Sequence, residues 1–267
     1  MSAPVVLVPG ACLGGWAWHA VATRLRAAGH DVYPVTLTGL GERAHLADPR
    51  IDVETHIADI LGTLDFEDLR DAVLVGHSYA GPVVTAVAHR RPSRLSRVVY
   101  LDTGALPDGT SIADAQPAEL RQRQRAEADR GGDGWRWPVP SRRVLASGSY
   151  GSAAGLRDEQ YRLIAARATP HPYATFVSPV HLEGPWPASV QRAAILCTEG
   201  GLSLASLRRL VAQGDPLAVM LGAGEWLDPA KWTLHELPTG HWAMFSMPEE
   251  LADLQRDIAA RSDGDSP

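Results

Sequence analysis

Short runs of apolar residues alternate with amphipathic stretches along the first hundred residues of the chain. Uninterrupted apolar runs of this length are typical of strands that are buried on both faces of a parallel sheet. They predict strands at residues 4–8, 31–37, 71–76 and 97–101. Between them, apolar residues recur at helical spacing near residues 18–28, 53–64 and 79–91. This alternation of strands and helices predicts βαβ units and an α/β fold.

The alternation stops after Asp102 and resumes near residue 193. The intervening residues are rich in Gly, Pro, Arg and Trp, with helical patterns near 117–129 and 158–168. Strand-like runs return at 193–198 and 232–237, and Ser246 to Glu249 reads as a capping box that opens a final helix. We therefore predict an α/β core made of residues 1–104 and 191–267, interrupted by a mostly helical insertion, residues 105–190.

The composition is that of an ordinary globular protein. Its 267 residues are 45% hydrophobic and 21% charged, which is enough to bury one large core. The formal net charge of −6 argues against nucleic acid as a partner, because nucleic acid requires a basic face. No apolar stretch approaches the ~20 residues of a membrane span, and the N-terminus lacks the features of a signal peptide. We expect a cytoplasmic protein that does not enter a membrane.

The two cysteines, Cys12 and Cys197, lie far apart in apolar, strand-like surroundings. Such surroundings favour buried free thiols over a disulfide framework or a metal site. No nucleotide, flavin or metal motif accompanies them, so we expect no cofactor.

The stretch LVGHSYAG, residues 74–81, places Ser78 between a predicted strand and a predicted helix. Gly76 and Ala80 flank the serine, so the segment differs from the pattern G-x-S-x-G only by one alanine. Small residues are required where a strand turns sharply into a helix, because neighbouring backbone approaches closely there. Such a turn would lift the Ser78 hydroxyl above the carboxyl edge of the sheet and direct the N-terminus of the helix toward it. Ser78 is therefore a candidate nucleophile.

A serine hydroxyl needs a base to remove its proton before it attacks a substrate. His241 follows the last predicted strand on a glycine-containing loop, at the sheet edge that also carries Ser78, and is the candidate base. The backbone amides of Ala11, after the first strand, and Tyr79, at the start of a helix, can turn toward Ser78. These two amides are the candidate donors of an oxyanion hole.

Together these motifs resemble those of the α/β-hydrolase superfamily, most closely the small branch that includes plant methyl esterases and hydroxynitrile lyases. The resemblance is carried by VVLVPGACLGGWAWHAVATRLRAAGHDV, GHSYAG, VVYLDTGALP and TGHWAM, and it covers about residues 1–105 and 193–261. It implies a mostly parallel sheet with flanking helices and an inserted helical cap. It also implies Ser78 as nucleophile, His241 as base, and the amides of Ala11 and Tyr79 as oxyanion donors. The chain departs from the family at Pro9, where histidine is usual, and this should leave the backbone donors intact.

The third member of a catalytic triad is the acid that holds the imidazole in the correct tautomer. The resemblance leaves the identity of this acid open. The family usually places an aspartate just past the strand that follows the cap, where this chain reads ILCTEGG. Glu199 lies at the end of that strand and is one candidate. Asp102, at the end of VVYLD, is the other, because some α/β-hydrolases place their acid after that strand. We favour Asp102 and keep Glu199 as the alternative.

The predicted cap carries aromatic residues that would shape an apolar pocket for a small, hydrophobic substrate. The candidate pocket residues are Cys12, Trp135, Trp137, Trp186 and Trp242. The leading hypothesis is a serine hydrolase that cleaves an ester, thioester or lactone of a mid-sized hydrophobic substrate through an acyl-enzyme on Ser78. One alternative is a lyase or cyclase that acts on a natural-product, polyketide-like intermediate with Ser78 and His241 as acid and base. Another is a non-catalytic protein of this fold that binds a small ligand.

Overall fold

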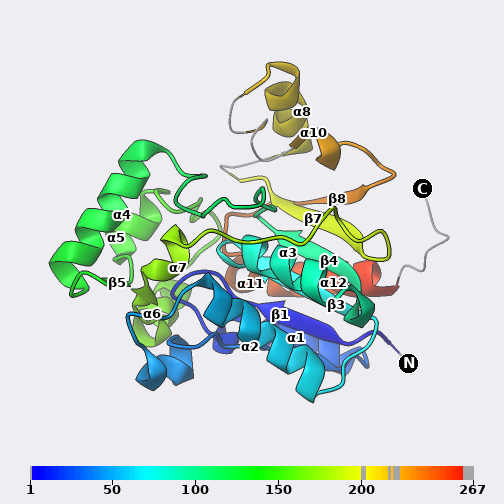
Figure 1. Cartoon of the computed structure of the whole chain (residues 1–267), viewed down its shortest axis with the longest axis horizontal. Coiled ribbons are helices and arrows are strands. Elements are labelled where there is room, and N and C mark those ends of the chain that lie inside the picture. Colours follow the sequence, from blue (N-terminus) through cyan, green and yellow to red (C-terminus); the bar gives the residue numbers. More distant parts are fainter. Residues whose placement is uncertain (1, 200–202, 216–217, 219–222, 261–267) are drawn as a thin grey trace.

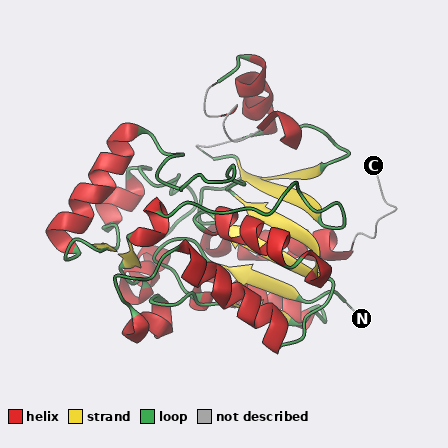
Figure 2. Cartoon of the chain, in the orientation of Figure 1, coloured by secondary structure: helices red, strands yellow, loops and turns green. Residues whose placement is uncertain are grey.

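A six-stranded sheet forms the centre of the protein, with helices on both faces (Figures 1 and 2). The computed structural model describes residues 2–199, 203–215, 218 and 223–260. The strand order is β2-β1-β3-β4-β7-β8, and every pairing in this sheet is parallel. The strands are β1 (Val5–Val8), β2 (Val32–Pro34), β3 (Ala72–His77), β4 (Leu95–Leu101), β7 (Gln191–Cys197) and β8 (Trp232–Leu237). The carboxyl ends of all six strands therefore lie at one edge of the sheet.

Two apolar cores lie against the two faces of this sheet. Val6 and Val8 contribute to the core under α2 (Val53–Phe66) and α3 (Ala80–Arg90). Val5 and Leu7 point the other way, into the core under three other helices. Those helices are α1 (His19–Ala27), α11 (Ala243–Ser246) and α12 (Pro248–Ala260). Because the strands are buried on both faces, they read as uninterrupted apolar runs, and the predicted α/β class and parallel sheet are confirmed.

Shorter elements connect the strands. Helices α8 (Leu204–Ala212) and α10 (Ala223–Trp226) lie between β7 and β8, at the top of Figure 1, and contribute Leu207 and Trp226 to the core on the α3 side. Three 3₁₀ helices span Gly15–Trp18, Gly41–Leu46 and Pro92–Arg94. None of the helices within the described ranges is both long and apolar enough to cross a membrane.

The inserted segment, residues 105–190, lies between β4 and β7 and adds no strand to the six-stranded sheet. It forms α4 (Ala118–Gly131), α5 (Arg142–Ala146), α6 (Asp158–Arg167), α7 (Ala174–Val177), and an antiparallel pair of β5 (Arg136–Trp137) and β6 (His171–Pro172). In Figure 1 its helices occupy the left of the view, beyond the carboxyl ends of the strands, and its last residues run back across the sheet to the start of β7. The inserted segment therefore faces the sheet edge at which the motifs place the candidate nucleophile.

Two local predictions are wrong. The second strand ends at Pro34 and not at residue 37. The reason is that Thr36 forms hydrogen bonds outside the sheet: its hydroxyl accepts one from the amide of Gly15, and its carbonyl accepts one from Arg43. Ser246 does not open the last helix. It is the final residue of α11, and its hydroxyl is engaged with Thr239 and the carbonyl of Trp242, so α12 begins at Pro248 without it.

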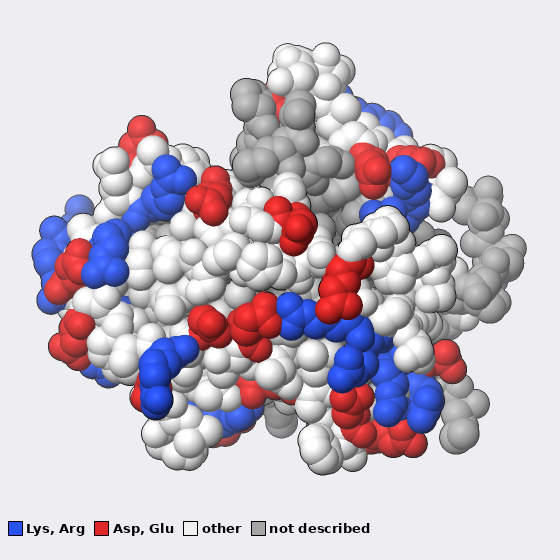
Figure 3. Space-filling view, viewed as in Figure 1, with Lys and Arg blue, Asp and Glu red and all other residues white. Residues whose placement is uncertain are grey.

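Charged side chains of both signs are interspersed over the face of the molecule shown in Figure 3. The arginines of α4 illustrate the arrangement. Arg123 pairs with Glu127 one turn further along the helix, at 2.9 Å, and Arg125 pairs with Asp129. The Arg-rich stretch of α4 is therefore largely neutralised by its own helix.

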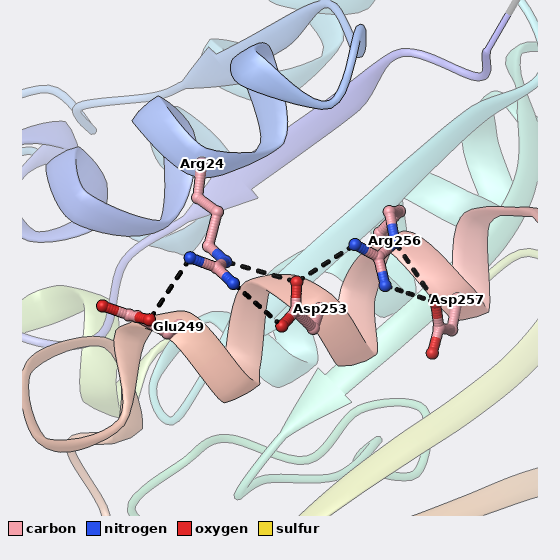
Figure 4. A network of polar contacts seen from close by, with 5 residues as sticks. All are labelled: Arg24, Glu249, Asp253, Arg256 and Asp257. Carbon is pink, nitrogen blue, oxygen red and sulfur yellow. Dashed lines mark hydrogen bonds and ion pairs between the residues drawn. The ribbon is translucent and has the colours of Figure 1, made fainter.

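Helices α1 and α12 are joined by a surface network of ion pairs (Figure 4). Arg24 lies 3.3 Å from a carboxylate oxygen of Glu249 and 3.1 Å from one of Asp253. Arg256 continues the network to Asp253 and Asp257, at 3.1 Å in both cases. All five side chains are at least 40% exposed, so solvent screens the pairs and each contributes little to stability.

We expect the apolar contact between α1 and the core to contribute more than this network. Leu25→Ala removes a side chain that is 1% exposed and should lower the free energy of unfolding by about 2–5 kcal/mol. Arg24→Ala, at the neighbouring position, should lower it much less, because the ion pairs that it removes are exposed to solvent. Urea-induced unfolding measures both values. A loss for Arg24→Ala as large as that for Leu25→Ala would contradict this ranking.

Candidate active site

Ser78 occupies the turn between β3 and α3 in a left-handed backbone conformation, with φ of 52°. This conformation costs about 1–3 kcal/mol for a residue other than glycine and persists only where the surroundings enforce it. The Ser78 amide donates to the carbonyl of Leu101 at 3.2 Å, and the Ser78 carbonyl accepts from Thr103 Oγ1 at 2.6 Å. A Cβ at Gly81 would lie 2.4 Å from the same Thr103 Oγ1, so the turn requires a residue without a side chain there.

His241 lies on the loop between β8 and α11 and is fixed from several directions. Its Nδ1 lies 2.6 Å from Asp102 Oδ2. Its carbonyl accepts a hydrogen bond from His77 Nε2 at 2.8 Å, and its amide donates to the carbonyl of Ser152 at 2.8 Å. A Cβ at Gly151 would lie 2.5 Å from Cγ of the imidazole, so the backbone of Gly151 packs directly on the ring. Because Gly151 and Ser152 belong to the inserted segment, that segment helps to hold the histidine.

Of the two candidate acids, the structure brings Asp102 to His241. Asp102 follows β4, and its Oδ1 accepts the amide of Cys197 at 3.3 Å. Burial alone would raise the pKa of Asp102, but the hydrogen bond and charge of His241 outweigh it and hold the pKa below its usual value. The carboxylate therefore accepts the Nδ1 proton and leaves Nε2 as the basic nitrogen. Glu199 is exposed, its amide bonds to the carbonyl of Thr239, and no contact among the described residues joins it to His241.

Ser78 lies where two cavities meet beneath the inserted segment. The His241 cavity, with a volume of about 290 Å³, contains both Ser78 and His241 on its wall. The Trp226 cavity, of about 330 Å³, also has Ser78 on its wall and is otherwise mostly apolar. The residues that line both cavities are Ser78, Tyr79, Ile112 and Gln116. In this structure Ser78 Oγ forms no hydrogen bond with any described residue, so the hydroxyl is free to meet a ligand.

The amides of Ala11 and Tyr79 donate to no acceptor within the described part of the chain, and both residues line the His241 cavity. The next amide along the first loop, that of Cys12, is occupied, because it donates to His171 Nδ1 at 3.0 Å. Two backbone amides without an acceptor thus belong to residues on the wall of the cavity that contains Ser78, and they remain candidate donors to an oxyanion.

His171 is a site residue that the sequence did not single out. It lies on β6 of the inserted segment, is fully buried, and packs on the ring of Tyr79 with a centroid distance of 4.5 Å. Its hydrogen bond to Cys12 links the inserted segment to the loop that carries Ala11. A single histidine in the stretch TPHPY has no motif around it, so only the folded structure reveals this contact.

The structure places three of the five predicted pocket residues on a cavity wall. Cys12, Trp137 and Trp242 line the His241 cavity. The prediction is wrong for the other two, which line neither cavity. Trp135 stacks with the guanidinium of Arg136, 4.8 Å from the ring centre. Trp186 donates its indole N–H to the carbonyl of Val190, within its own loop.

Buried neutral histidines surround the site. Burial lowers the pKa of His77 to about 3 and that of His56 to about 4, and it lowers the pKa of His171 well below the usual value. The neutral form of His56 accepts the hydroxyl of Tyr79 at 2.7 Å and donates to the carbonyl of Thr38 at 2.9 Å. These rings act as fixed hydrogen-bonding groups at neutral pH.

A nucleophile turn, a histidine after the last strand and an insertion over the sheet edge are together typical of one class of protein. The model of the Alpha/beta hydrolase family matches residues 5–254, and the chain belongs to this family. A curated relative, the carbendazim hydrolyzing esterase of Nocardioides sp. (strain SG-4G), is 35% identical over 257 residues, which cover 93% of this chain and 96% of that protein. Methylesterase 9 of Arabidopsis thaliana is 24% identical over 266 residues, which cover 95% and 97% of the two chains. The chain is a hydrolase of the esterase type.

Solved structures share the fold over nearly the whole chain. One is an extracellular alpha/beta-hydrolase from a Paenibacillus species, which is described as homologous in structure and function to tobacco salicylic acid binding protein 2. It has a TM-score of 0.73 at 20% sequence identity, and the match covers 98% of this chain and 100% of that one. Polyneuridine aldehyde esterase has a TM-score of 0.68 at 18% identity, with 97% and 100% covered. The predicted α/β-hydrolase fold is confirmed.

We expect Gly151→Ala to displace His241, because the added methyl group would lie within 2.9 Å of three ring or Cβ atoms. The rate at which a fluorophosphonate labels Ser78 should fall by about 10²-fold, the size of effect that a displacement of about 1 Å produces. Gly148→Ala is the matched control, because Gly148 also has a positive φ, 73°, but its added Cβ would meet only one atom, at 3.9 Å. Equal rates for the two variants would contradict this role of Gly151.

The free energy of unfolding should fall as the pH decreases from about 6.5 toward 4. The unfolded chain binds protons near the ordinary histidine pKa of 6.5, whereas folded His77 and His56 bind them only near 3 and 4. Their stabilising contribution is thus complete above pH 6.5, and each loses about 1.4 kcal/mol per pH unit below it. His77→Gln should flatten the slope, and His45→Gln, at an exposed position, should not. Denaturant titrations at several pH values test this, and an unchanged slope in His77→Gln would contradict it.

Proposed function

We propose that this esterase cleaves its ester through an acyl-enzyme on Ser78. The observation that carries the proposal is the 2.6 Å contact between Asp102 and His241, at the wall of the cavity that contains Ser78. Asp102 holds the imidazole so that His241 Nε2 accepts the Ser78 proton while Oγ attacks the carbonyl carbon. The carbonyl oxygen gains a negative charge and accepts hydrogen bonds from the amides of Ala11 and Tyr79.

The tetrahedral intermediate then collapses, the ester C–O bond breaks, and the imidazolium of His241 gives its proton to the departing alcohol. Water next loses a proton to His241 and attacks the acyl carbon. A second collapse breaks the bond to Ser78 Oγ, releases the carboxylic acid and returns the proton to the serine. Asp102 stays ionised throughout and stabilises each imidazolium.

The inserted segment, residues 105–190, is proposed to act as a cap on the core formed by residues 1–104 and 191–267. Three of its contacts support this role: Gly151 on the ring of His241, Ser152 on its amide, and His171 on the amide of Cys12. The two cavities would receive the acyl and alcohol parts of the substrate on opposite sides of Ser78. Their volumes fit a mid-sized, mostly apolar small molecule. We place this reaction in the cytoplasm.

Burst kinetics test the proposal. The panel contains p-nitrophenyl esters from acetate to decanoate, together with methyl esters and carbendazim, which the names of the relatives suggest. The wild type should show a burst of p-nitrophenol that Ser78→Ala abolishes. Asp102→Asn should lower kcat by about 10⁴-fold, because it leaves His241 in the wrong tautomer.

The control is Glu199→Gln, which should retain wild-type turnover because Glu199 is exposed and does not contact His241. A large loss in Glu199→Gln with none in Asp102→Asn would contradict the assignment of the acid. Turnover that survives Ser78→Ala would contradict the acyl-enzyme and favour lyase or cyclase chemistry at the same site.

A further inference from the structure

The wall of the His241 cavity contains few polar side chains, and most of them already have partners within the protein. The hydroxyl of Tyr79 bonds to His56, and that of Tyr150 donates to Glu127 at 2.9 Å. The hydroxyl of Ser149 is engaged with the side chains of Arg123 and Ser147. These groups are therefore occupied before any substrate arrives.

Gln116 and Gln124 differ from these residues. Both line the His241 cavity, and neither carboxamide forms a hydrogen bond with another residue in the described ranges. Gln124 is only 2% exposed, and Gln116 Oε1 is buried without a partner. Leaving the buried Gln116 Oε1 without a partner is unfavourable, and this cost disappears if a ligand supplies the missing hydrogen bond.

Helix geometry explains why these two side chains reach the cavity. Gln116, Leu120 and Gln124 are spaced by four residues, and all three line the cavity. Leu120 and Gln124 lie one turn apart on the same face of α4, and Gln116 lies just before the first residue of that helix, Ala118. The neighbouring arginines Arg123 and Arg125 belong to other faces of α4 and pair with acidic residues of the same helix. Among the residues that the structure describes, no Lys, Arg, Asp or Glu lines the His241 cavity.

We propose that Gln116 and Gln124 select the substrate: an uncharged ester whose ring system carries hydrogen-bonding nitrogen or oxygen atoms. This inference rests on the ester hydrolysis proposed above. A carboxamide presents both donors and an acceptor, so it matches a ring nitrogen, an N–H or a hydroxyl. A charged group would lose its hydration in this cavity without gaining an opposite charge.

The carboxamides of Gln116 and Gln124 have different positions relative to the ester bond that is cleaved. Gln116 lines both cavities beside Ser78, so it faces the part of the substrate next to the scissile bond. Gln124 lines only the His241 cavity, further along α4, so it faces the distal edge of the group bound there. Gln124 therefore binds the ring of the substrate, and Gln116 binds the atoms near the ester group.

The test compares two esters of almost equal shape, methyl quinoline-6-carboxylate and methyl naphthalene-2-carboxylate, which differ by one ring nitrogen. Wild-type kcat/KM should be at least about tenfold higher for the quinoline ester. Gln124→Leu nearly keeps the side-chain volume and removes the carboxamide, and it should lower the ratio of kcat/KM for the quinoline ester to that for the naphthalene ester to about 1. Gln122→Leu, on the exposed side of α4, is the matched control and should keep the wild-type ratio.

Gln116→Leu should lower kcat/KM for both esters, because its partner lies near the ester group that they share. An unchanged quinoline preference in Gln124→Leu, or an equal loss on both esters, would overturn the assignment of Gln124. The monomethyl ester of naphthalene-2,6-dicarboxylate, which carries a second, ionised carboxylate, tests the requirement for neutrality. Its kcat/KM should be at least about tenfold below that of the neutral ester, and equal values would overturn that requirement.

Binding separates this inference from the proposed function. A separate outcome is that the wild type hydrolyses neither methyl ester. In that case, calorimetric titration of each ester into the Ser78→Ala variant measures its binding affinity, and with it the role of the Gln124 carboxamide, in the absence of hydrolysis. Tighter binding of the quinoline ester that is lost in the Ser78→Ala, Gln124→Leu double variant supports the role of the amides. Equal affinities for the two esters overturn it.

Discussion

The hydrogen bond between Asp102 and His241 is the interaction on which the site depends. It joins the end of β4 to the loop after β8, two segments that are 139 residues apart in sequence. A loop histidine would otherwise be mobile, but this one is bonded through its ring, its amide and its carbonyl. Two of these anchors belong to the core, and the third, Ser152, belongs to the inserted segment. The same contacts that join the inserted segment to the core therefore also orient His241.

Two residues of this site have a strained backbone. Ser78 and Asp102 both have positive φ, 52° and 48°, at the carboxyl ends of neighbouring strands of the sheet. Side chains that leave a strand in this conformation project above the sheet edge instead of into the cores on either face. The strain is stabilised by the hydrogen bonds around it, such as that from Thr103 to the Ser78 carbonyl. The rigid parallel sheet and the hydrogen bonds around it thus stabilise two strained backbone conformations at one site.

Local sequence pattern predicted the strands, the class of fold, and the positions of Ser78 and His241, because each depends on periodicity or on one short motif. The choice between Asp102 and Glu199 was not decidable in this way. Both follow strands that are neighbours in the sheet, β4 and β7, and only the path of the loops decides which carboxylate reaches the histidine. His171, Gln116 and Gln124 were missed because their roles arise from how the inserted segment packs, which has no periodic signal.

A crystal structure of the protein after reaction with a fluorophosphonate tests the central claim most directly. We predict phosphorus bonded to Ser78 Oγ, a phosphoryl oxygen that accepts hydrogen bonds from the amides of Ala11 and Tyr79, and His241 Nδ1 still bonded to Asp102. An unmodified Ser78, or a phosphoryl oxygen directed away from both amides, would contradict the account.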